Sequence, residues 1–256
     1  MEEFAQVSGI SRPTLSKYFN DPLSVRGSTR KRIEQALDKF DYQPNIYAVN
    51  QNRKLTKNIG IVVPHLTDPF FAKIAGIIED HIIAHGFRPV LLGSNGDPEQ
   101  ETENLNNLRL LKPAGVLLAP LGRSTHSDEI KSFCAATPTV LFDSNLDGIK
   151  GHFVGLDQQQ SIGLIVEYLC QTGSAPAFFE MKEPSNPNAV KRRNAYLTAM
   201  ERLGHAPDLI QVDGSGWDFE EIGLQKGMQV LSDGRLSTDT ISVSYTHLTL
   251  PTTPYV

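Results

Sequence analysis

The sequence is poor in cysteine and has no long apolar run. Two cysteines occur among its 256 residues, Cys134 and Cys170, and each lies within an apolar stretch. We interpret them as small core residues of a protein in a reducing compartment rather than as a disulfide. No stretch approaches about 20 consecutive apolar residues, the length of a membrane span, and the N-terminus has no apolar run of the signal-peptide type. These absences predict a cytoplasmic protein without a membrane segment.

The sequence also lacks the patterns that enzymes and metal sites require. Its seven histidines and two cysteines are scattered, without the spacing of metal ligands. Asp143 and Asp157 end predicted strands, as catalytic carboxylates can, but no nucleophile and base accompany them. The segment GSNGD (93–97) lacks the spacing and the Lys-Ser/Thr end of a phosphate-binding loop. We therefore expect no catalysis, no cofactor and no metal.

Positive charge is concentrated at the N-terminus, although the formal net charge of the whole chain is −5. Residues 1–58 hold ten Lys/Arg against six Asp/Glu, whereas residues 59–256 hold fourteen against twenty-three. Lysine and arginine near a nucleic-acid backbone release condensed counterions, which favours binding. The distribution predicts a small basic head on an acidic body.

The N-terminal segment has the pattern of three short helices. Residues 2–8 form the first, closed by Gly9 in a left-handed conformation. Ser11 is expected to cap a second helix over 12–20, whose first turn tolerates Pro13. Thr29 is the predicted N-cap of a third helix that ends near Phe40. Two helices joined by a tight glycine turn, with a third behind them, are typical of a helix-turn-helix domain.

The remainder alternates between buried strands and amphipathic helices, which predicts an α/β fold with a doubly wound parallel sheet. Strands are expected at 58–64, 87–94, 114–120, 139–145, 151–157, 175–181, 208–214 and 238–243, and helices at 70–86, 98–111, 127–136, 161–173, 188–204 and 219–233. The last fifteen residues, 242–256, are rich in Thr and Pro and have no periodicity. We expect them to be non-native adapter sequence, with a short divergent C-terminus as the alternative.

Seven segments follow one another along the chain: FAQVSGISRPTLSKYFN, YQPN, TKNIGIVVPHLTDPFFAKIA, PAGVLLAP, TVLFDSN, VGLDQQQSIGL and RRNAYLTAM. Their order and spacing resemble the lac/galactose repressor (LacI/GalR) family of bacterial transcription regulators. The resemblance implies a small all-α helix-turn-helix head and a two-lobed body like a periplasmic binding protein, with an incomplete second lobe. The implied domains are a head (1–44), a hinge (45–58), a first lobe (59–158), a partial second lobe (159–241) and the tail (242–256). The resemblance implies that the chain starts inside the family's first helix. We expect the genomic reading frame of this protein to continue past Ile241 for roughly 70–90 residues.

Carried onto this sequence, the resemblance implies which residues of the second helix read DNA. Arg12, Pro13 and Lys17 take the positions that read bases, and Ser11, Thr14 and Ser16 take those that bind phosphate. Leu15, Phe19 and Ala5 are expected on the opposite, core side. In the hinge, Asn45 and Gln51 are the implied DNA contacts. Val49 and Gln51 replace an Arg and a Leu of the family, so we expect the hinge to unstack bases poorly.

The resemblance also implies a small-molecule effector, a sugar or sugar derivative, between the lobes of a homodimer that forms through the body. The implied effector contacts are Asp68, Phe70, Phe71, Asn186, Asn188, Arg192 and Trp217. Ligands of open α/β sheets bind outside the carboxyl ends of the strands, where these segments fall. The expected function is a DNA-binding regulator, most simply a repressor, whose operator affinity responds to the effector. The alternatives are a solute-binding protein that only captures a sugar and a truncated fragment without function.

Overall fold

The computed structural model describes residues 1–43, 54–122, 126–149, 151–182, 187–212, 219–234 and 241–243. The chain divides into two compact units, Met1–Thr56 and Lys57–Val256. Each unit has its own apolar core. We call the first unit the head and the second the body.

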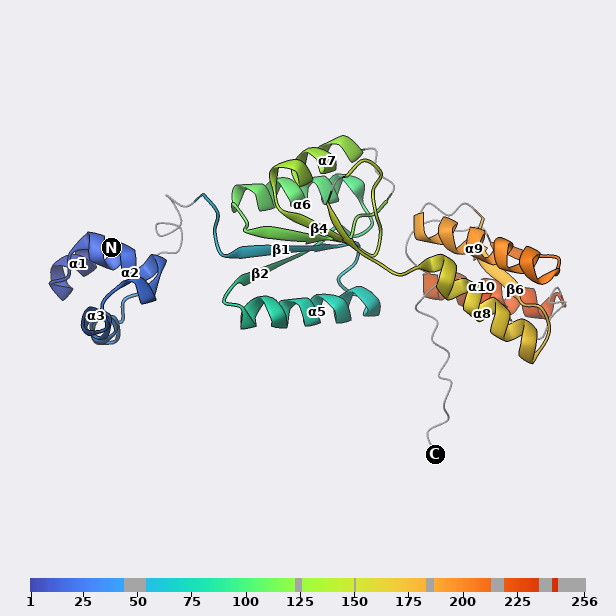
Figure 1. Ribbon diagram of the computed structural model, residues 1–256, viewed down its shortest axis with the longest axis horizontal. Coiled ribbons are helices and arrows are strands. Elements are labelled where there is room, and N and C mark those ends of the chain that lie inside the picture. The colour runs from blue at the N-terminus through green and yellow to red at the C-terminus, as the bar shows by residue number, and fades with distance from the viewer. Residues whose placement is uncertain are drawn as a thin grey trace, which may run out of the picture. The chain divides into compact units, whose positions relative to one another are not determined.

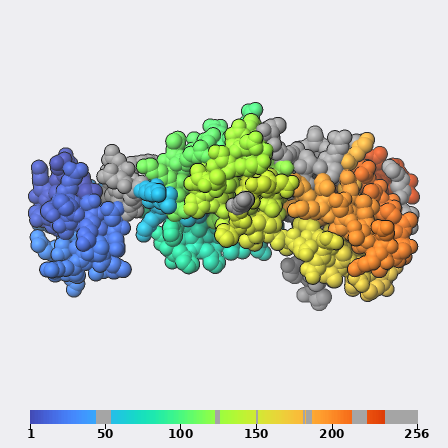
Figure 2. Space-filling model, turned by 45° about the horizontal axis from the view of Figure 1, so that its top comes forward, coloured from blue at the N-terminus to red at the C-terminus, as the bar shows by residue number. Residues whose placement is uncertain are grey.

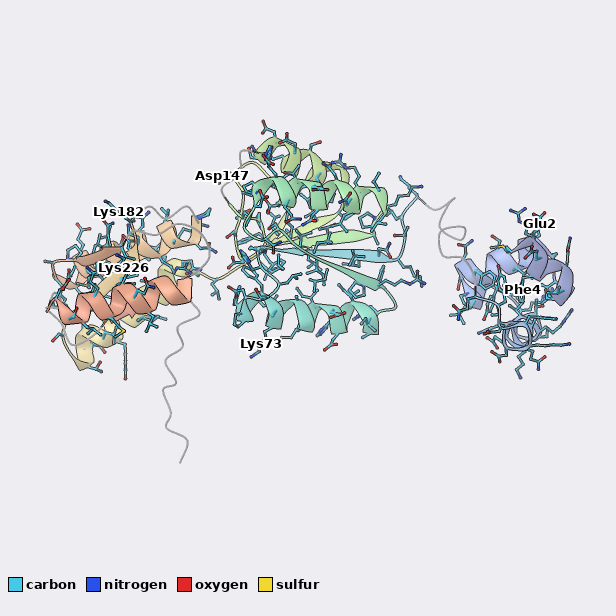
Figure 3. All side chains as sticks on the ribbon, turned by 180° about the vertical axis from the view of Figure 1, so that it is seen from behind. Glu2, Phe4, Lys73, Asp147, Lys182 and Lys226 are labelled. Carbon is cyan, nitrogen blue, oxygen red and sulfur yellow. The ribbon has the colours of Figure 1, made fainter. Side chains whose placement is uncertain are left out.

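The head consists of α1 (Glu2–Ser8), α2 (Arg12–Asn20), a 3-10 turn (Pro22–Ser24) and α3 (Gly27–Phe40) (Figures 1 and 2). Gly9 follows α1 with φ 64°, as the turn between the first two helices requires. Phe4, Leu15 and Ile33, one from each helix, are almost completely buried against one another, and Phe4 lies among the three helices in Figure 3. Tyr42 stacks on Phe4 with ring centroids 4.2 Å apart. The predicted helix-turn-helix arrangement is confirmed.

The prediction for the start of the third helix was wrong. The N-cap of α3 is Arg26, not Thr29, and Gly27 and Ser28 already belong to the helix. Thr29 therefore lies inside the first turn, where its capping preference has no effect. Ser11 is the N-cap of α2 as predicted, but its hydroxyl does not cap a backbone N–H and lies 2.8 Å from the Thr14 hydroxyl.

The body contains a five-stranded parallel sheet in the order β2-β1-β3-β4-β5, which forms lobe 1 together with three helices. The strands are β1 (Asn58–Val63), β2 (Arg88–Gly93), β3 (Gly115–Leu118), β4 (Thr139–Phe142) and β5 (His152–Val154), and the helices are α5 (Pro69–Ala84), α6 (Pro98–Leu110) and α7 (Ser127–Ala136). Helix α5 covers one face of the sheet, and α6 and α7 cover the other (Figure 1). Alternate β1 residues accordingly enter different cores, Val62 toward α6 and Ile61 toward α5.

A second parallel sheet of three described strands, in the order β7-β6-β8, forms lobe 2. It comprises β6 (Ala177–Met181), β7 (Asp208–Val212) and β8 (Ile241–Val243) with α8 (Gln158–Thr172), α9 (Pro187–Leu203) and α10 (Phe219–Ser232). Phe178 and Tyr196 stack in the core between β6 and the α8–α9 pair, with ring centroids 4.8 Å apart. On the opposite face, Val230 of α10 packs near Ala177 and Ile210.

Several predicted element ends in the body differ from the structure, and two of them differ for clear local reasons. The strand expected over 139–145 ends at Phe142, because Asp143 has a φ of 62° that extended backbone does not allow. The helix expected from Ser161 begins at Gln158, because the Asp157 carboxylate accepts the Gln160 N–H and caps it. Cys134 and Cys170 are free and only half-buried. Within the described ranges, no helix is long and apolar enough to cross a membrane.

Candidate functional site

Helix α2 presents a polar, basic surface on the side away from the core of the head. Arg12, Pro13 and Lys17 are exposed, and Leu15 is fully buried. Ser11 is exposed as well, and Thr14 and Ser16 are partly buried. Because Leu15, Tyr18 and Phe19 pack inward, the basic side chains are directed outward from a rigid support. Phe19 and Ala5 belong to this core as predicted, although both are only partly buried.

The Arg12 guanidinium is available for an external partner. Its nearest carboxylate is that of Glu2, at 4.0 Å, and the two side chains are 66% and 80% exposed. An ion pair this long and this exposed contributes little to stability, since water solvates both groups. The guanidinium can therefore exchange this contact for a planar, bidentate acceptor.

At the carboxyl edge of the lobe 1 sheet, two of the predicted effector residues have structural roles. The Asp68 carboxylate caps α5 by accepting the N–H groups of Phe70 and Phe71, at 2.9 and 3.4 Å. Phe71 is buried in the core on the α5 face of the sheet. Phe70 is half-buried and meets the Phe71 ring edge-on. Phe70 is therefore less buried than Phe71, and its side chain does not act as a cap as that of Asp68 does.

Asn188, near the start of α9, connects lobe 2 to lobe 1. Its Nδ2 donates to the Asp143 carbonyl oxygen (3.0 Å), to Asp143 Oδ1 (3.2 Å) and to Ser144 Oγ (3.2 Å). We call this set of contacts the inter-lobe clasp. An amide nitrogen has two hydrogens, so three acceptors fully occupy it. Asn188 and Asp143 were considered separately in the sequence, and their contact was not predicted.

The acceptors of the inter-lobe clasp are held by an unusual turn. Ser144 N–H donates to the Phe142 carbonyl at 2.7 Å across Asp143, whose φ is positive. A three-residue turn with a positive central φ is rare and strained, and such strain is concentrated at functional sites. The turn aims the main-chain and side-chain oxygens of Asp143 at the same nitrogen.

Glu101 of α6 is a second residue that sequence reasoning missed. It is 0% exposed, and its Oε1 accepts the N–H of Leu121, in the loop after β3, at 2.9 Å. Burial raises the pKa of Glu101 to about 7, although the Leu121 hydrogen bond lowers it. Among the described residues, Glu101 Oε2 has no hydrogen-bond partner although it is buried, and the same holds for the Oγ of Ser94, the residue after β2. A sequence signal for this burial was present, because Glu101 is spaced from Leu105 and Leu108 so that all three lie on the same, buried face of α6.

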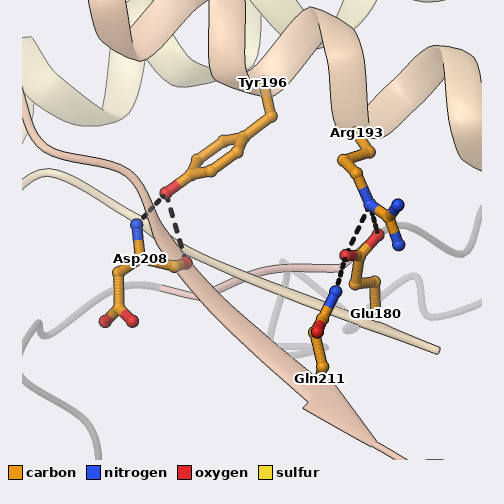
Figure 4. A network of polar contacts seen from close by, with 5 residues as sticks. All are labelled: Glu180, Arg193, Tyr196, Asp208 and Gln211. Carbon is orange, nitrogen blue, oxygen red and sulfur yellow. Dashed lines mark hydrogen bonds and ion pairs between the residues drawn. The ribbon is translucent and has the colours of Figure 1, made fainter. Parts of the chain in front are cut away.

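Helix α9 carries Asn188 and Arg192, which are both buried. Two other side chains of this helix, Arg193 and Tyr196, attach it to the sheet of lobe 2 through polar contacts (Figure 4). Arg193 Nε lies 2.7 and 2.8 Å from the two carboxylate oxygens of Glu180 on β6. Gln211 of β7 donates to the same carboxylate at 2.9 Å. The Tyr196 hydroxyl accepts the Asp208 N–H at 2.9 Å and donates to the Pro176 carbonyl at 2.8 Å.

Four of the predicted site residues, Asn45, Gln51, Asn186 and Trp217, lie outside the described residues, as does Val49. The described part of the chain contains no group of three or more His, Cys, Asp or Glu that could hold a metal ion. The predicted contacts that the structure brings together are those of α2 in the head and Asn188 and Arg192 on α9. A basic helix-turn-helix head on a two-lobed α/β body defines the class of transcription regulators built on a binding-protein fold.

Comparison with known families identifies the chain. A family model described as "Periplasmic binding proteins and sugar binding domain of LacI family" matches residues 56–214, and one described as "Bacterial regulatory proteins, lacI family" matches residues 1–45. The chain belongs to the LacI family. The predicted family and fold class are thus confirmed, and the relatives below are transcriptional regulators rather than enzymes.

Among curated relatives, the HTH-type transcriptional regulator PtxS of Pseudomonas aeruginosa is 28% identical over 174 residues, which are 68% of this chain and 51% of the relative. The ribose operon repressor of Escherichia coli is 27% identical over 225 residues, 86% of this chain and 66% of the relative. The chain spans about half the length of the first curated relatives it matches. A crystal structure of the lac repressor dimer bound to operator and an anti-inducer has the same fold, with a TM-score of 0.76 and 22% identity over 94% of this chain and 72% of that one.

Proposed function

We propose that this protein is a sequence-specific DNA-binding regulator that acts as a repressor and whose operator affinity is controlled by a sugar-like effector. The observation that carries the proposal is the outward-facing Arg12 and Lys17 on a helix whose opposite side is buried in a helix-turn-helix core. The match of the attached body to a sugar-binding domain supports the effector. The proposed DNA target also supports a proposed location in the cytoplasm.

In the proposed complex, the N-terminal half of α2 enters the major groove. Arg12 donates its two parallel N–H groups to guanine N7 and O6, which specifies the base. Pro13 offers apolar contact to a thymine methyl group, and Lys17 reaches a neighbouring base edge. Three hydroxyl residues, Ser11, Thr14 and Ser16, bind phosphate and orient the helix. Asn45 and Gln51 of the hinge are proposed to contact the minor groove.

Two substitutions in α2 are expected to affect DNA binding differently. On the DNA upstream of the gene itself, Arg12→Ala should lose about 1–3 kcal/mol of discrimination against an unrelated duplex, because a bidentate base contact is removed. Lys17→Ala should weaken binding to the upstream DNA. Fluorescence anisotropy at fixed salt measures both affinities, and two chains per duplex, measured by light scattering, would support a dimer.

Lys73→Ala is the matched control, because it removes an exposed lysine from the outer side of α5 in the body (Figure 3). It is expected to bind like the wild type. Equal binding of wild type and both α2 variants to upstream and unrelated DNA would refute the proposed reading helix. That result would favour a protein that only captures a sugar.

The proposed effector site lies where α9 faces the carboxyl edge of the lobe 1 sheet. Buried Arg192 offers a planar fork for a hydroxyl or carboxylate of the ligand, and Asn188 and Phe70 are proposed to line the same cleft. Asn186 and Trp217 are further proposed contacts, with the indole stacked on the sugar face.

Asp68 and Phe71 act by shaping the start of α5. The names and titles of relatives mention ribose, fructose 1-phosphate and D-xylulofuranose, which are the first compounds to test.

Arg192→Met is expected to weaken binding of any sugar that the protein takes by about 10- to 100-fold, since a charge-assisted hydrogen bond contributes about 1.5–3 kcal/mol. Titration calorimetry with D-ribose, fructose 1-phosphate and D-xylulose measures the affinity. The exposed Arg202→Met variant of the same helix is the control and should bind normally. Unchanged affinity in Arg192→Met would remove this residue from the site.

A homodimer through the body is the proposed assembly, since a near-palindromic operator needs two heads. Support comes from large apolar side chains exposed around the edge strand β2 and the end of α5. Leu91 lies on the edge strand, and Ile83 and Phe87 flank the turn that leads into it. An exposed edge strand with apolar neighbours is unfavourable in a monomer.

A further inference from the structure

Gly122, in the loop after β3, meets Pro187, the first residue of α9, so that lobe 1 and lobe 2 are in close contact here. A Cβ atom built at Gly122 would lie 2.4 Å from Pro187 Cδ and 2.7 Å from Cγ. Both distances are far below van der Waals contact. The pyrrolidine ring is rigid and cannot move aside as a flexible side chain would. Gly122 therefore permits an approach of the lobes that an added side chain would prevent.

The residues next to this contact are fixed in both lobes. On the lobe 1 side, the buried Glu101 carboxyl holds the N–H of Leu121, the residue before Gly122. On the lobe 2 side, Asn188, the residue after Pro187, makes the inter-lobe clasp with Asp143 and Ser144. A rigid steric contact thus lies directly beside a set of directional hydrogen bonds between the same two lobes.

We propose that Gly122 and Pro187 form a steric stop that sets how far the lobes close, and that Glu101 positions this stop. The stop determines whether the inter-lobe clasp forms, and so where Asn188 and Arg192 are held in the cleft. This inference rests on the proposed function, because it assigns the stop to the closure of the effector site. Any side chain larger than hydrogen at position 122 would hold the lobes apart and break the inter-lobe clasp.

Hydrogen exchange of the Asn188 side-chain amide, followed by NMR on the full chain without effector, measures the clasp directly. Gly122→Ala is expected to accelerate this exchange about tenfold, which corresponds to about 1.4 kcal/mol. Adding Pro187→Ala removes the ring atoms that the new methyl group meets. The double variant should return to within about twofold of the Pro187→Ala single variant, a rescue that a general loss of stability would not give.

Gly86→Ala is the matched control, because Gly86 also has a positive φ (75°), but a Cβ there meets nothing within 4 Å. It should lower thermal stability through the same backbone strain and leave the Asn188 exchange unchanged. Equal exchange in the Gly122→Ala and Gly86→Ala variants, or no rescue by Pro187→Ala, would overturn the stop. So would failure of both Gly122 variants to fold when Gly86→Ala folds. Because no effector or DNA is present, a sugar-binding or DNA-binding failure leaves this result intact and refutes only the proposed function.

Discussion

As the pH rises from 4.5 to 8, the free energy of unfolding of the Glu101→Gln variant is expected to increase by about 3 kcal/mol relative to that of the wild type. The carboxyl of Glu101 has a pKa of about 7 in the folded protein, against 4.5 for an unperturbed glutamate. Its folded-state pKa is raised, so the folded state binds the proton more tightly than the unfolded chain. Wild-type stability is therefore full below pH 4.5 and falls as the pH rises through 7, where a buried charge must form.

Glutamine removes that pH dependence but keeps an oxygen that can accept the Leu121 N–H. The measurement is the free energy of unfolding in urea, for both proteins at several pH values, so that any constant effect of the new amide group cancels. Glu99→Gln, an exposed change two residues earlier in α6, is the matched control for replacing a carboxyl group with an amide. A pH-independent difference for Glu101→Gln would mean that this carboxyl titrates normally in the folded state.

Much of the fold could be predicted because local signals agree with the tertiary structure. In the head, Gly9 needs a left-handed conformation and Leu15 lies at the centre of an amphipathic helix, so sequence spacing alone predicts the turn and the buried side. In the body, apolar runs of strand length alternate with helical periodicity, which predicts a parallel sheet. The exact helix starts depended on weaker capping preferences, which explains the error at Thr29.

The geometry of the inter-lobe clasp could not be predicted, because it depends on contacts between residues that are far apart in the sequence. Asn188 and Asp143 are 45 residues apart and belong to different lobes, one on helix α9 and the other in the turn after β4. No periodicity relates such residues, and a positive φ at an aspartate has no sequence signal as strong as that of glycine. At Asp68 the sequence identified the residue but not its role. The structure shows that its carboxylate caps α5 by accepting the N–H groups of Phe70 and Phe71.

The second large effect is expected at the polar network beneath α9. Arg193→Met should destabilise the protein by about 3 kcal/mol, because it leaves the Glu180 carboxylate buried without its cation. Glu180 is 1% exposed and Arg193 is 23% exposed. Breaking a buried ion pair costs about 3–5 kcal/mol of stability. We expect a loss at the lower end of this range, since Gln211 still donates to the Glu180 carboxylate and water can reach the position that Arg193 leaves.

The urea midpoint of Arg193→Met measures this loss, and the double variant Arg193→Met/Glu180→Leu should recover most of it, because no buried charge is left. Arg202→Met is the control: its partner Glu167 lies at 3.3 Å, but the two side chains are 60% and 42% exposed, so at most about 1 kcal/mol is expected. If the Arg193 and Arg202 variants lose the same stability, burial does not distinguish the two pairs. If the double variant is stable but binds sugar less well, the network serves to orient Arg192, the neighbour of Arg193 on α9, more than to hold the lobe together.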